Sequence, residues 1–382
     1  MSRQQTFGAG RTHSIFIDEA GCAWACGWND YGQLGLGDTI QRNQPEKIEN
    51  LPFITSVSVG GYYSMFLDIE GNVWACGYNL DGQLGLGLGD RNFINVPERI
   101  TNLPKIQAIS CSFHNHSLFL DEDGCVWACG HNTHGELGLG DHENRAHPVR
   151  IYEIPRMQSI SAGYCHSLFL DGDGCVWTCG YNHHGQLGLG HKISRNIPER
   201  IEDFGNIKSI DGVFHSIFLD EEGSVWVCGH NDYGQLGLEN ISNRLLPERI
   251  AQLPKIQSIF AGGYHSIFLD EDGCVWSCGN NSAGQLGMGE SSFKLHFTQR
   301  NSPSKVNISK QKSISAGFSH SIFLDEVGQV WACGHNQYGQ LGLGHFAQMD
   351  HPEKIDNLPK IVSLNIEKRG LRVKSARNVS VL

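Results

Sequence analysis

A pattern of hydrophobic and polar positions recurs seven times along the chain, at intervals of about fifty residues. Residues 256–260 (Ile-Gln-Ser-Ile-Phe) alternate in polarity, which predicts a strand, and residues 265–269 (His-Ser-Ile-Phe-Leu) predict a second one. Residues 270–273 (Asp-Glu-Asp-Gly) predict a tight turn into a third strand at 274–278. A long glycine-rich loop then leads to a short fourth strand at 303–306, where proline is tolerated at the start of an outer strand.

The same unit is marked along the whole chain by two short motifs. Trp-x-Cys-Gly begins at Trp24, Trp74, Trp127, Trp177, Trp226, Trp276 and Trp331. Asn-x-x-Gly-[Gln/Glu]-Leu-Gly follows it at Asn29, Asn79, Asn132, Asn182, Asn231, Asn281 and Asn336. Four short antiparallel strands in each of seven repeats predict an all-β fold, a seven-bladed β-propeller of four-stranded blades. No segment keeps a helical period of 3.6, which excludes a helical solenoid.

The two ends of the chain predict how the ring closes. The chain begins close to a second strand, residues 12–17, and residues 361–366 read as a first strand with no second strand after it. We expect this C-terminal strand to complete the N-terminal blade and remove its free edge, so that N- and C-terminal strands pair. The competing interpretation places residues 5–7 there. We expect residues 1–366 to form the propeller and residues 367–382 to form a basic C-terminal tail.

Thirteen cysteines raise the question of disulfides. Seven belong to the Trp-x-Cys set, and four more, such as Cys274, precede the tryptophan by two residues. Two cysteines four apart on a strand lie roughly 13 Å apart, beyond the reach of a disulfide. The spacing is also not that of a zinc knuckle. We interpret the cysteines as small core residues in a reducing compartment, and the absence of a signal-like or membrane-spanning run predicts an intracellular protein, cytoplasmic or nuclear.

The repeat resembles a known family. The matching pattern is Ala-Gly-x-x-His-Ser-x-x-Leu, then Asp-Gly-x-Val-Trp-x-x-Gly-x-Asn, then Gly-Gln-Leu-Gly-Leu-Gly and Pro. It is similar to the regulator of chromosome condensation repeat family and covers nearly the whole chain. The resemblance implies a seven-bladed propeller. Its members include an exchange factor for the small GTPase Ran, ubiquitin-ligase propellers, ciliary scaffolds and a plant UV-B photoreceptor, so it implies no single function.

Two of these activities need features that the sequence lacks. The exchange factor inserts a β-wedge from one blade loop, and here only the sixth long loop, residues 290–302, carries a sizeable insertion. The photoreceptor needs tryptophans in Gly-Trp-Arg-His-Thr runs, whereas Trp28 is followed by asparagine.

The residues that could serve in catalysis occupy positions that recur in the structural repeat. A His-Ser pair begins the second strand in six repeats, and tyrosine replaces the histidine in the second repeat at Tyr63. A catalytic site is not needed six times, so we interpret these histidines as tying neighbouring backbone through their ring nitrogens. The glycine loops have the wrong spacing for a dinucleotide site and precede no helix. We predict no catalytic residue, no cofactor and no metal site, and leave exchange activity, which needs no covalent chemistry, open.

Acidic residues concentrate in the turns between second and third strands, which all emerge on one face. These turns contain no Lys or Arg, so we predict a negative ring that could attract a basic partner. The alternative is that the first Asp of each turn shapes the turn and the others confer solubility. The set is Asp18, Glu19, Asp68, Glu70, Asp121, Glu122, Asp123, Asp171, Asp173, Asp220, Glu221, Glu222, Asp270, Glu271, Asp272, Asp325 and Glu326.

The long loops emerge on the opposite face with arginine, tyrosine and histidine at recurring positions. This composition is typical of binding hot spots, and the alternative is that each Arg braces its own loop against the next blade. The candidate residues are Arg42, Arg91, Arg145, Arg195, Arg244, Arg300, Tyr31, His134, His183, Tyr233 and Tyr338.

The charge distribution completes the functional prediction. The chain carries a net charge of −11, which argues against broad nucleic-acid binding by the propeller, while its tail is basic. We therefore predict a monomeric, non-catalytic protein–protein interaction platform that binds a protein partner, either a small GTPase or a basic protein. The alternatives are a guanine-nucleotide exchange factor for a Ran-like GTPase and, more remotely, a metal-dependent or hydrolytic enzyme in the central channel.

Overall fold

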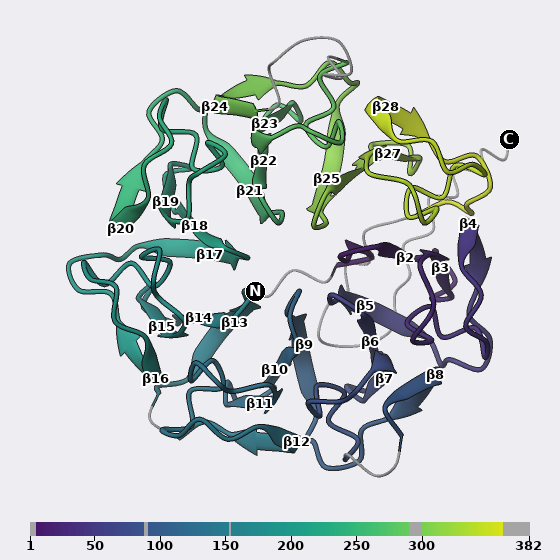
Figure 1. Cartoon of the computed structure of the whole chain (residues 1–382), viewed down its shortest axis with the longest axis horizontal. Coiled ribbons are helices and arrows are strands. Elements are labelled where there is room, and N and C mark those ends of the chain that lie inside the picture. The colour runs from purple at the N-terminus through teal and green to yellow at the C-terminus, as the bar shows by residue number, and fades with distance from the viewer. Residues whose placement is uncertain (1–4, 88–90, 153, 290–298, 362–382) are drawn as a thin grey trace, which may run out of the picture.

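The computed structural model describes residues 5–87, 91–152, 154–289 and 299–361, which form seven four-stranded antiparallel sheets arranged in a ring (Figure 1). Each sheet keeps its strands in chain order, from an inner strand at the axis to an outer strand at the rim. The described residues contain no helix. The predicted seven-bladed, all-β propeller is therefore confirmed. The basic tail, and residues 290–298 of the sixth long loop, lie outside the described residues.

Blades are numbered here in chain order, and each contains four consecutive strands. Blades 1 to 3 comprise β1 (Phe7–Ala9), β2 (His13–Ile17), β3 (Ala23–Gly27), β4 (Arg42–Lys47), β5 (Ile54–Val59), β6 (Tyr63–Asp68), β7 (Val73–Tyr78), β8 (Phe93–Arg99), β9 (Ile106–Cys111), β10 (His116–Asp121), β11 (Val126–Gly130) and β12 (Arg145–Arg150). Blades 4 and 5 comprise β13 (Met157–Ala162), β14 (His166–Asp171), β15 (Val176–Gly180), β16 (Arg195–Arg200), β17 (Ile207–Gly212), β18 (His215–Asp220), β19 (Val225–Gly229) and β20 (Arg244–Arg249). Blades 6 and 7 comprise β21 (Ile256–Ala261), β22 (His265–Asp270), β23 (Val275–Asn280), β24 (Gln299–Lys305), β25 (Gln311–Ala316), β26 (His320–Asp325), β27 (Val330–Gly334) and β28 (Met349–Lys354).

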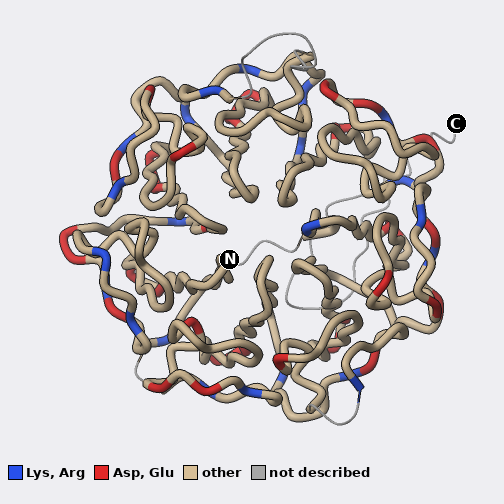
Figure 2. The backbone as a smooth tube through the Cα atoms, viewed as in Figure 1, with Lys and Arg blue, Asp and Glu red and all other residues tan. Residues whose placement is uncertain are grey.

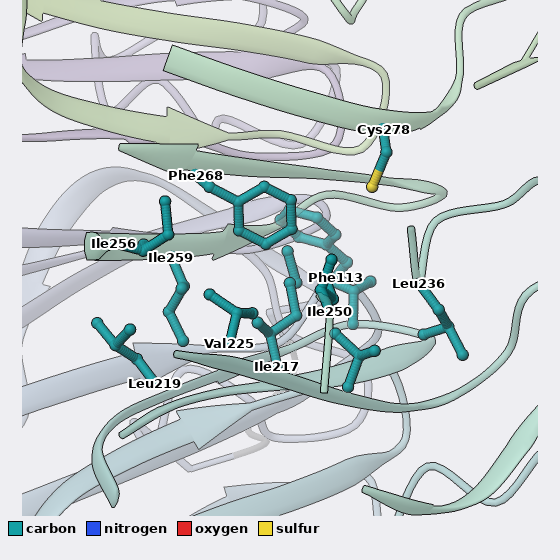
Figure 3. Close-up of a cluster of buried hydrophobic side chains, with 13 residues drawn as sticks. Phe113, Ile217, Leu219, Val225, Leu236, Ile250, Ile256, Ile259, Phe268 and Cys278 are labelled. Carbon is teal, nitrogen blue, oxygen red and sulfur yellow. The ribbon is translucent and has the colours of Figure 1, made fainter. Parts of the chain in front are cut away.

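The hydrophobic core lies between the blades rather than within any one of them. Successive side chains of a strand point to opposite faces of its sheet, so each second strand packs against both neighbouring blades. In β18, Ile217 and Leu219 pack against Phe268 of blade 6 (Figure 3), whereas Phe218 packs against Leu168 of blade 4. All seven hydrophobic clusters join adjacent blades in this way. A single blade therefore cannot bury its own apolar surface.

A buried histidine–serine hydrogen bond connects each pair of neighbouring blades, with one exception. The Nε2 atom of the histidine that begins a second strand lies 2.7–3.1 Å from the Oγ atom of the equivalent serine in the next blade. The pairs are His13–Ser64, His116–Ser167, His166–Ser216, His215–Ser266, His265–Ser321 and His320–Ser14. The partner is a serine side chain and not the neighbouring backbone, which corrects the expectation from sequence.

The hydrogen-bond geometry fixes the protonation state of these histidines. Each serine hydroxyl donates to a main-chain carbonyl of the preceding blade, as Ser266 does to Gln235 at 2.7 Å. Because its one hydrogen is used there, the serine accepts a hydrogen from the histidine Nε2. Burial lowers the pKa of five of the histidines to about 3 and that of His116 to about 4. They are therefore neutral imidazoles that donate from Nε2.

Tyr63 replaces this histidine between blades 2 and 3 and makes the same connection. Its hydroxyl donates to the carbonyl of His116 at 2.6 Å and accepts the amide hydrogen of Ser112 at 3.0 Å. The Oγ atom of Ser117 lies 3.0 Å from the same tyrosine hydroxyl. The change of residue in the second repeat is thus a structural substitution.

The N-terminal strand takes the inner position of blade 1 that the C-terminal strand was expected to fill, and the C-terminal end of the described chain joins the same blade. Strand β1 pairs with β2 and occupies the inner position of blade 1, with Phe7 opposite Phe16. Of residues 361–366, only Ile361 is described, and it forms a single antiparallel bridge with Asp18. Ile54 stands opposite Asp68 in the same way in blade 2. The N-terminal residues therefore form the inner strand of blade 1, in line with the alternative interpretation. Ile361 takes the place of the first residue of that strand.

We predict that Ser266→Ala lowers the free energy of unfolding by about 1–3 kcal/mol, because the buried Nε2–H of His215 loses its acceptor. Urea-induced unfolding followed by tryptophan fluorescence measures the change. Ser242→Ala is the matched control, since Ser242 is exposed, and we expect less than about 0.5 kcal/mol there. Equal losses in the two variants would contradict the role of the inter-blade bond.

We also predict that stability falls as the pH is lowered from 7.5 to 5. The unfolded chain binds protons at histidine near pH 6.5, whereas the six folded histidines do so only near pH 3–4. Each can therefore cost on the order of 2 kcal/mol at pH 5. Asp211 acts in the opposite sense, since burial raises its pKa to about 6. Equal unfolding free energies at pH 7.5 and 5 would contradict neutral, buried histidines.

Candidate functional site

The propeller has two different faces. The turns between second and third strands emerge on what we call the turn face. The turns between first and second strands, and the long loops between third and fourth strands, emerge on the loop face, because the four strands of each blade alternate in direction. All candidate residues from the sequence belong to one face or the other.

The first aspartate of every turn on the turn face is a structural brace. In blade 4, Oδ1 of Asp171 accepts the amide hydrogens of Asp173 and Cys175, and Oδ2 accepts the indole Nε1–H of Trp177. The same indole contact recurs in all seven blades, at 2.9–3.1 Å. Asp18, Asp68, Asp121, Asp171, Asp220, Asp270 and Asp325 are therefore committed to the turn and to the tryptophan.

The other ten acids of this set are exposed, and cations lie among them. The exposed acids are Glu19, Glu70, Glu122, Asp123, Asp173, Glu221, Glu222, Glu271, Asp272 and Glu326. A cation in the outer strand stands opposite each tryptophan, at Lys47, Arg99, Arg150, Arg200, Arg249, Lys305 and Lys354. Five more, Lys105, Arg156, Lys255, Lys310 and Lys360, pack against turn glycines. Lys and Arg thus lie among the acids of this face, and both kinds of charge are spread around the ring as a whole (Figure 2), which argues against a uniformly negative face.

Most of the loop-face arginines are engaged within their own loops. Arg42 pairs with Asp38 at 2.7 Å and with Glu46, and Arg145 pairs with Asp141 at 2.5 Å. Arg195 and Arg244 pair with the glutamate four residues on, and Arg91 pairs with Glu98 at 2.5 Å. These arginines brace their own loops and outer strands, and each of these ion pairs lies within one blade, whereas the alternative interpretation placed the contact against the next blade. The contacts of Arg300 are not among those described.

Aromatic side chains from every blade meet on the loop face, around the axis of the propeller. We call this group the aromatic cluster. It joins Tyr31 and Tyr338 of the long loops to the first-to-second-strand turns and the ends of third strands. Its other members are Trp28, Tyr62, Tyr78, Phe113, His114, Tyr164, Phe214, Tyr264 and Phe318.

The aromatic cluster is continuous, and one cation joins its two halves. Phe214 stacks on Tyr264 with ring centroids 4.8 Å apart, and Trp28 meets Tyr62 edge-on at 5.2 Å. The guanidinium of Arg11 lies 5.3 Å from the ring centroid of Tyr62 and 4.9 Å from that of Phe318. Both rings are partly exposed. The cation–π contacts with Arg11 hold them in position.

Two candidate loop residues extend the aromatic cluster, and one lies at its edge. Tyr233 contacts Tyr264 with ring centroids 4.9 Å apart, and His134 contacts His131, whose ring lies 4.6 Å from that of His114, as well as Tyr181 at 4.9 Å. His183 also contacts Tyr181, at 4.6 Å. Tyr31, Tyr338, Tyr233, His134 and His183 thus belong to one surface, whereas the loop arginines serve the outer rim.

The central channel contains a cavity of about 410 Å³. Phe113 and Phe318, from opposite parts of the ring, lie with centroids 6.1 Å apart at its loop-face end. Polar groups of the cavity wall include Ser58, Ser110, Ser161 and Asp211. Asp211 Oδ2 accepts the amide hydrogen of Ala261 at 2.8 Å, and Ser110 accepts that of Ala162. These wall residues join neighbouring inner strands.

The repeated histidines and cysteines do not line this channel. The seven Trp-x-Cys thiols are buried between blades, and Cys278 lies 3.5 Å from the Gln235 carbonyl that Ser266 also contacts. The ring of histidines and cysteines proposed for a channel enzyme is therefore part of the blade interfaces. A different group, His114, Glu136 and Cys165, brings three potential metal ligands together near the aromatic cluster.

The electrostatics of that group centre on Glu136. His131 Nδ1 lies 2.6 Å from Glu136 Oε1. Burial is the largest influence on Glu136 and raises its pKa, but the hydrogen bond with His131, the nearby His116 and a backbone hydrogen bond together lower it, so the net shift is downward. Burial likewise lowers the pKa of His131, and the same contact raises it above its ordinary value. The pair is therefore a carboxylate facing a histidine that holds its proton more firmly than usual.

Comparison with known proteins agrees with the repeat structure. Regulator of chromosome condensation (RCC1) repeats match residues 20–67, 70–120, 123–170, 173–219, 222–269, 272–324 and 327–365. The chain belongs to the regulator of chromosome condensation repeat family. Among the described residues, no helix is long and apolar enough to cross a membrane.

Members of the family with quite different names are similar to this chain. A probable E3 ubiquitin-protein ligase, HERC4 of Mus musculus, is 45% identical over 163 residues, which is 41% of this chain and 15% of that protein. The ultraviolet-B receptor UVR8 of Arabidopsis thaliana is 30% identical over 166 residues, 42% of this chain and 38% of the receptor. The chain thus spans well under half the length of these curated relatives.

A solved structure covers more of the chain. Prp20p of Saccharomyces cerevisiae, reported with its binding to Gsp1p and histones, superposes with a TM-score of 0.79 at 26% identity, over 92% of this chain and 88% of that one. Human WBSCR16 superposes equally well at 22% identity, which shows a shared fold. Proteins with different names thus share this propeller fold.

The sequence did not reveal most of the aromatic cluster. Arg11, Tyr62, Tyr164, Tyr264 and Phe318 occupy one or two positions before the repeated histidine, which vary between repeats. The available signal was the frequency of aromatic residues at those variable positions. It becomes a surface only when the ring places the seven turns together.

We predict that Asp171→Ala lowers the free energy of unfolding by about 2 kcal/mol or more, because two amide hydrogens and one indole hydrogen lose their acceptor. Asp173→Ala, in the same turn and exposed, should change it by less than about 0.5 kcal/mol. Thermal or urea unfolding of the two variants measures both. Similar stability of the two would contradict the division of this turn into brace and surface charge.

Proposed function

We propose that this propeller is a protein–protein interaction platform that binds partner segments on its loop face. The observation that carries the proposal is the partly exposed aromatic cluster around Arg11, whereas on the turn face the described cation–π contact is the single one between Arg150 and Tyr152. Tyrosine, tryptophan and arginine are the residues most enriched at the energetic centres of protein interfaces. Their rigid rings supply contact area at a low entropic cost.

Exposed apolar residues on the long loops extend this surface outward. Ile40, Leu80, Ile193, Ile241 and Phe346 are between 46% and 64% exposed. Large exposed apolar side chains that surround a half-exposed aromatic centre favour a partner interface over a solvated surface. The turn face instead presents exposed acids interspersed with lysine and arginine, a composition that suits solubility.

Site-specific photo-crosslinking tests which face binds. A benzophenone amino acid is placed at Tyr233 on the loop face and, in a second protein, at Glu222 on the turn face; both positions are exposed. We expect irradiation in cells to give discrete protein adducts from position 233 and few from position 222. Adding Tyr264→Ala, which removes the ring in contact with position 233, should weaken the adducts from 233.

The outcomes of this experiment are distinct. Adducts from position 222 alone would move the interface to the turn face. Absence of adducts from both positions, with folded protein, would contradict the proposed platform.

A second candidate function is guanine-nucleotide exchange on a small GTPase. The likeness to Prp20p, over 92% of this chain, favours it. Exchange requires only that a partner's nucleotide site be distorted by binding, so the lack of a catalytic motif does not count against it. The sixth long loop is the one loop whose insertion could correspond to an exchange factor's β-wedge. Most of that loop, residues 290–298, lies outside the described residues.

Release of a fluorescent nucleotide from a panel of small GTPases, with Ran included, decides between the two functions. We expect no acceleration by catalytic amounts of this protein. Acceleration would make it an exchange factor. A turn-face variant must reverse only exposed acids, Glu122, Asp123, Glu221 and Glu222 to Lys, because Asp121 and Asp220 brace their turns. If that variant kept full activity, the turn face would not be the exchange surface.

A further inference from the structure

We propose that His114, Glu136 and Cys165 form a binding site for a Zn²⁺ ion on the loop-face side of the interface between blades 3 and 4. One ligand atom from each residue lies within 4.8 Å of the other two. Imidazole nitrogen, carboxylate oxygen and thiolate sulfur are the three donor types that protein zinc sites use. Nothing in the proposed platform function requires this site.

Departures from the repeat coincide at this point. Glu136 stands where the other six repeats have glutamine, as at Gln235. Cys165 immediately precedes the repeated histidine, where no other repeat has cysteine, and His114 is the one histidine two residues before it. The three positions come from different parts of the repeat. Each departure replaces a residue by a metal ligand, and the fold brings all three together.

The side chains are arranged to accept an ion with little rearrangement. Ligands of a tetrahedral zinc ion lie about 3.3–3.8 Å from one another, so the three atoms need to move inward by about 1 Å. Nδ1 of His114 is buried without a hydrogen-bond partner. Glu136 is fully buried and Cys165 is buried as well. The buried Nδ1 atom of His114 is therefore a polar group that a bound ion would satisfy.

Neighbouring residues supply the support that metal ligands normally have. His131 contacts Oε1 of Glu136 at 2.6 Å, and the amide hydrogen of His134 is donated to Oε2 at 2.8 Å. Such bonds orient a ligating carboxylate and leave its remaining lone pairs for the ion. Binding also replaces the thiol proton of Cys165, which leaves to solvent, so that sulfur binds as thiolate.

An ion can reach the site from the loop face. A cavity of about 220 Å³ is lined by Arg11, Tyr62, His114 and Tyr164 among others. The positive charge of Arg11 lies over the rings of Tyr62 and Phe318, and Asp81, which accepts from Asn115 at 2.7 Å, adds negative charge nearby. The cavity leaves room for water as a fourth ligand, as in zinc sites with three protein ligands.

Blade 5 provides an internal comparison. There, His230 Nδ1 meets Gln235 Nε2 at 2.7 Å, in the place of the contact between His131 and Glu136. The positions equivalent to His114 and Cys165 are occupied by Val213 and Tyr264. Blade 5 therefore keeps the same fold with no ligand set, which identifies Glu136→Gln as a substitution that the repeat already tolerates.

The test is a titration of the chelator-treated full-length protein with Co²⁺ and with Zn²⁺. We expect one equivalent of Co²⁺ to give a thiolate-to-cobalt charge-transfer band in the near ultraviolet, and Zn²⁺ to abolish that band by displacement. Mg²⁺ should not compete, because it prefers oxygen ligands. Cys165→Ser should remove the band, whereas Cys175→Ser, which alters a half-buried thiol on the turn face, should leave it intact.

Two further variants separate ligation from folding. Glu136→Gln should lower the affinity for Zn²⁺ while leaving thermal stability in chelator unchanged. His131→Ala, which removes only the hydrogen bond to Glu136, should lower the affinity for Zn²⁺ by about 10–100-fold. No stoichiometric band in the wild-type protein, or a band that survives in Cys165→Ser, would overturn the site. Equal Zn²⁺ affinity of Glu136→Gln and wild type would remove Glu136 from it.

Discussion

The hydrogen bond from a buried histidine to a serine of the next blade is the interaction on which this ring depends. A blade cannot bury its own apolar faces, so neighbouring blades must meet in one register. The bond from His265 Nε2 to Ser321, and from Ser321 on to the Gln285 carbonyl, fixes that register with groups that have no access to water. Breaking it would leave a buried donor unpaired, which is more costly than the bond itself is stabilising.

This network also explains where variation is tolerated. Histidine, serine, cysteine and the braced aspartate are each committed to a neighbour, as His215, Ser216, Cys228 and Asp220 are in blade 5. The residues just before the histidine have no such commitment, and they emerge on the loop face around the axis. Differences between repeats therefore accumulate at one surface. Part of the aromatic cluster, and His114 and Cys165 of the group around Glu136, lie at these positions.

The fold could be predicted from sequence because its signal is local and is repeated seven times. Strand alternation, turn glycines and the tryptophan motif are all contained within one repeat. The inner strand of blade 1 was harder to predict because strand-like residues occur at both ends, and the sequence does not show that residues 7–9 pair with β2 there.

The candidate sites were harder to predict from sequence than the fold, because counting charged residues does not show which groups they pair with. Asp171 and Asp173 look alike in sequence, but only the first accepts the tryptophan indole. Arg145 looks like a binding residue, yet it pairs with Asp141 four residues earlier. Tyr62, Arg11 and Phe318 are far apart in the chain and become neighbours only when blades 1, 2 and 7 meet. Such a surface depends on ring closure, which no single repeat encodes.

The most direct test of this account is the nitrogen chemical shifts of the histidine rings, measured by NMR on ¹⁵N-labelled protein between pH 7.5 and 5. The inter-blade bond predicts that His13, His116, His166, His215, His265 and His320 are neutral, carry their hydrogen on Nε2 and do not titrate in this range. Their assignment follows from single substitutions. Titration of these rings near pH 6.5, or a hydrogen on Nδ1, would contradict the interaction on which the ring is built.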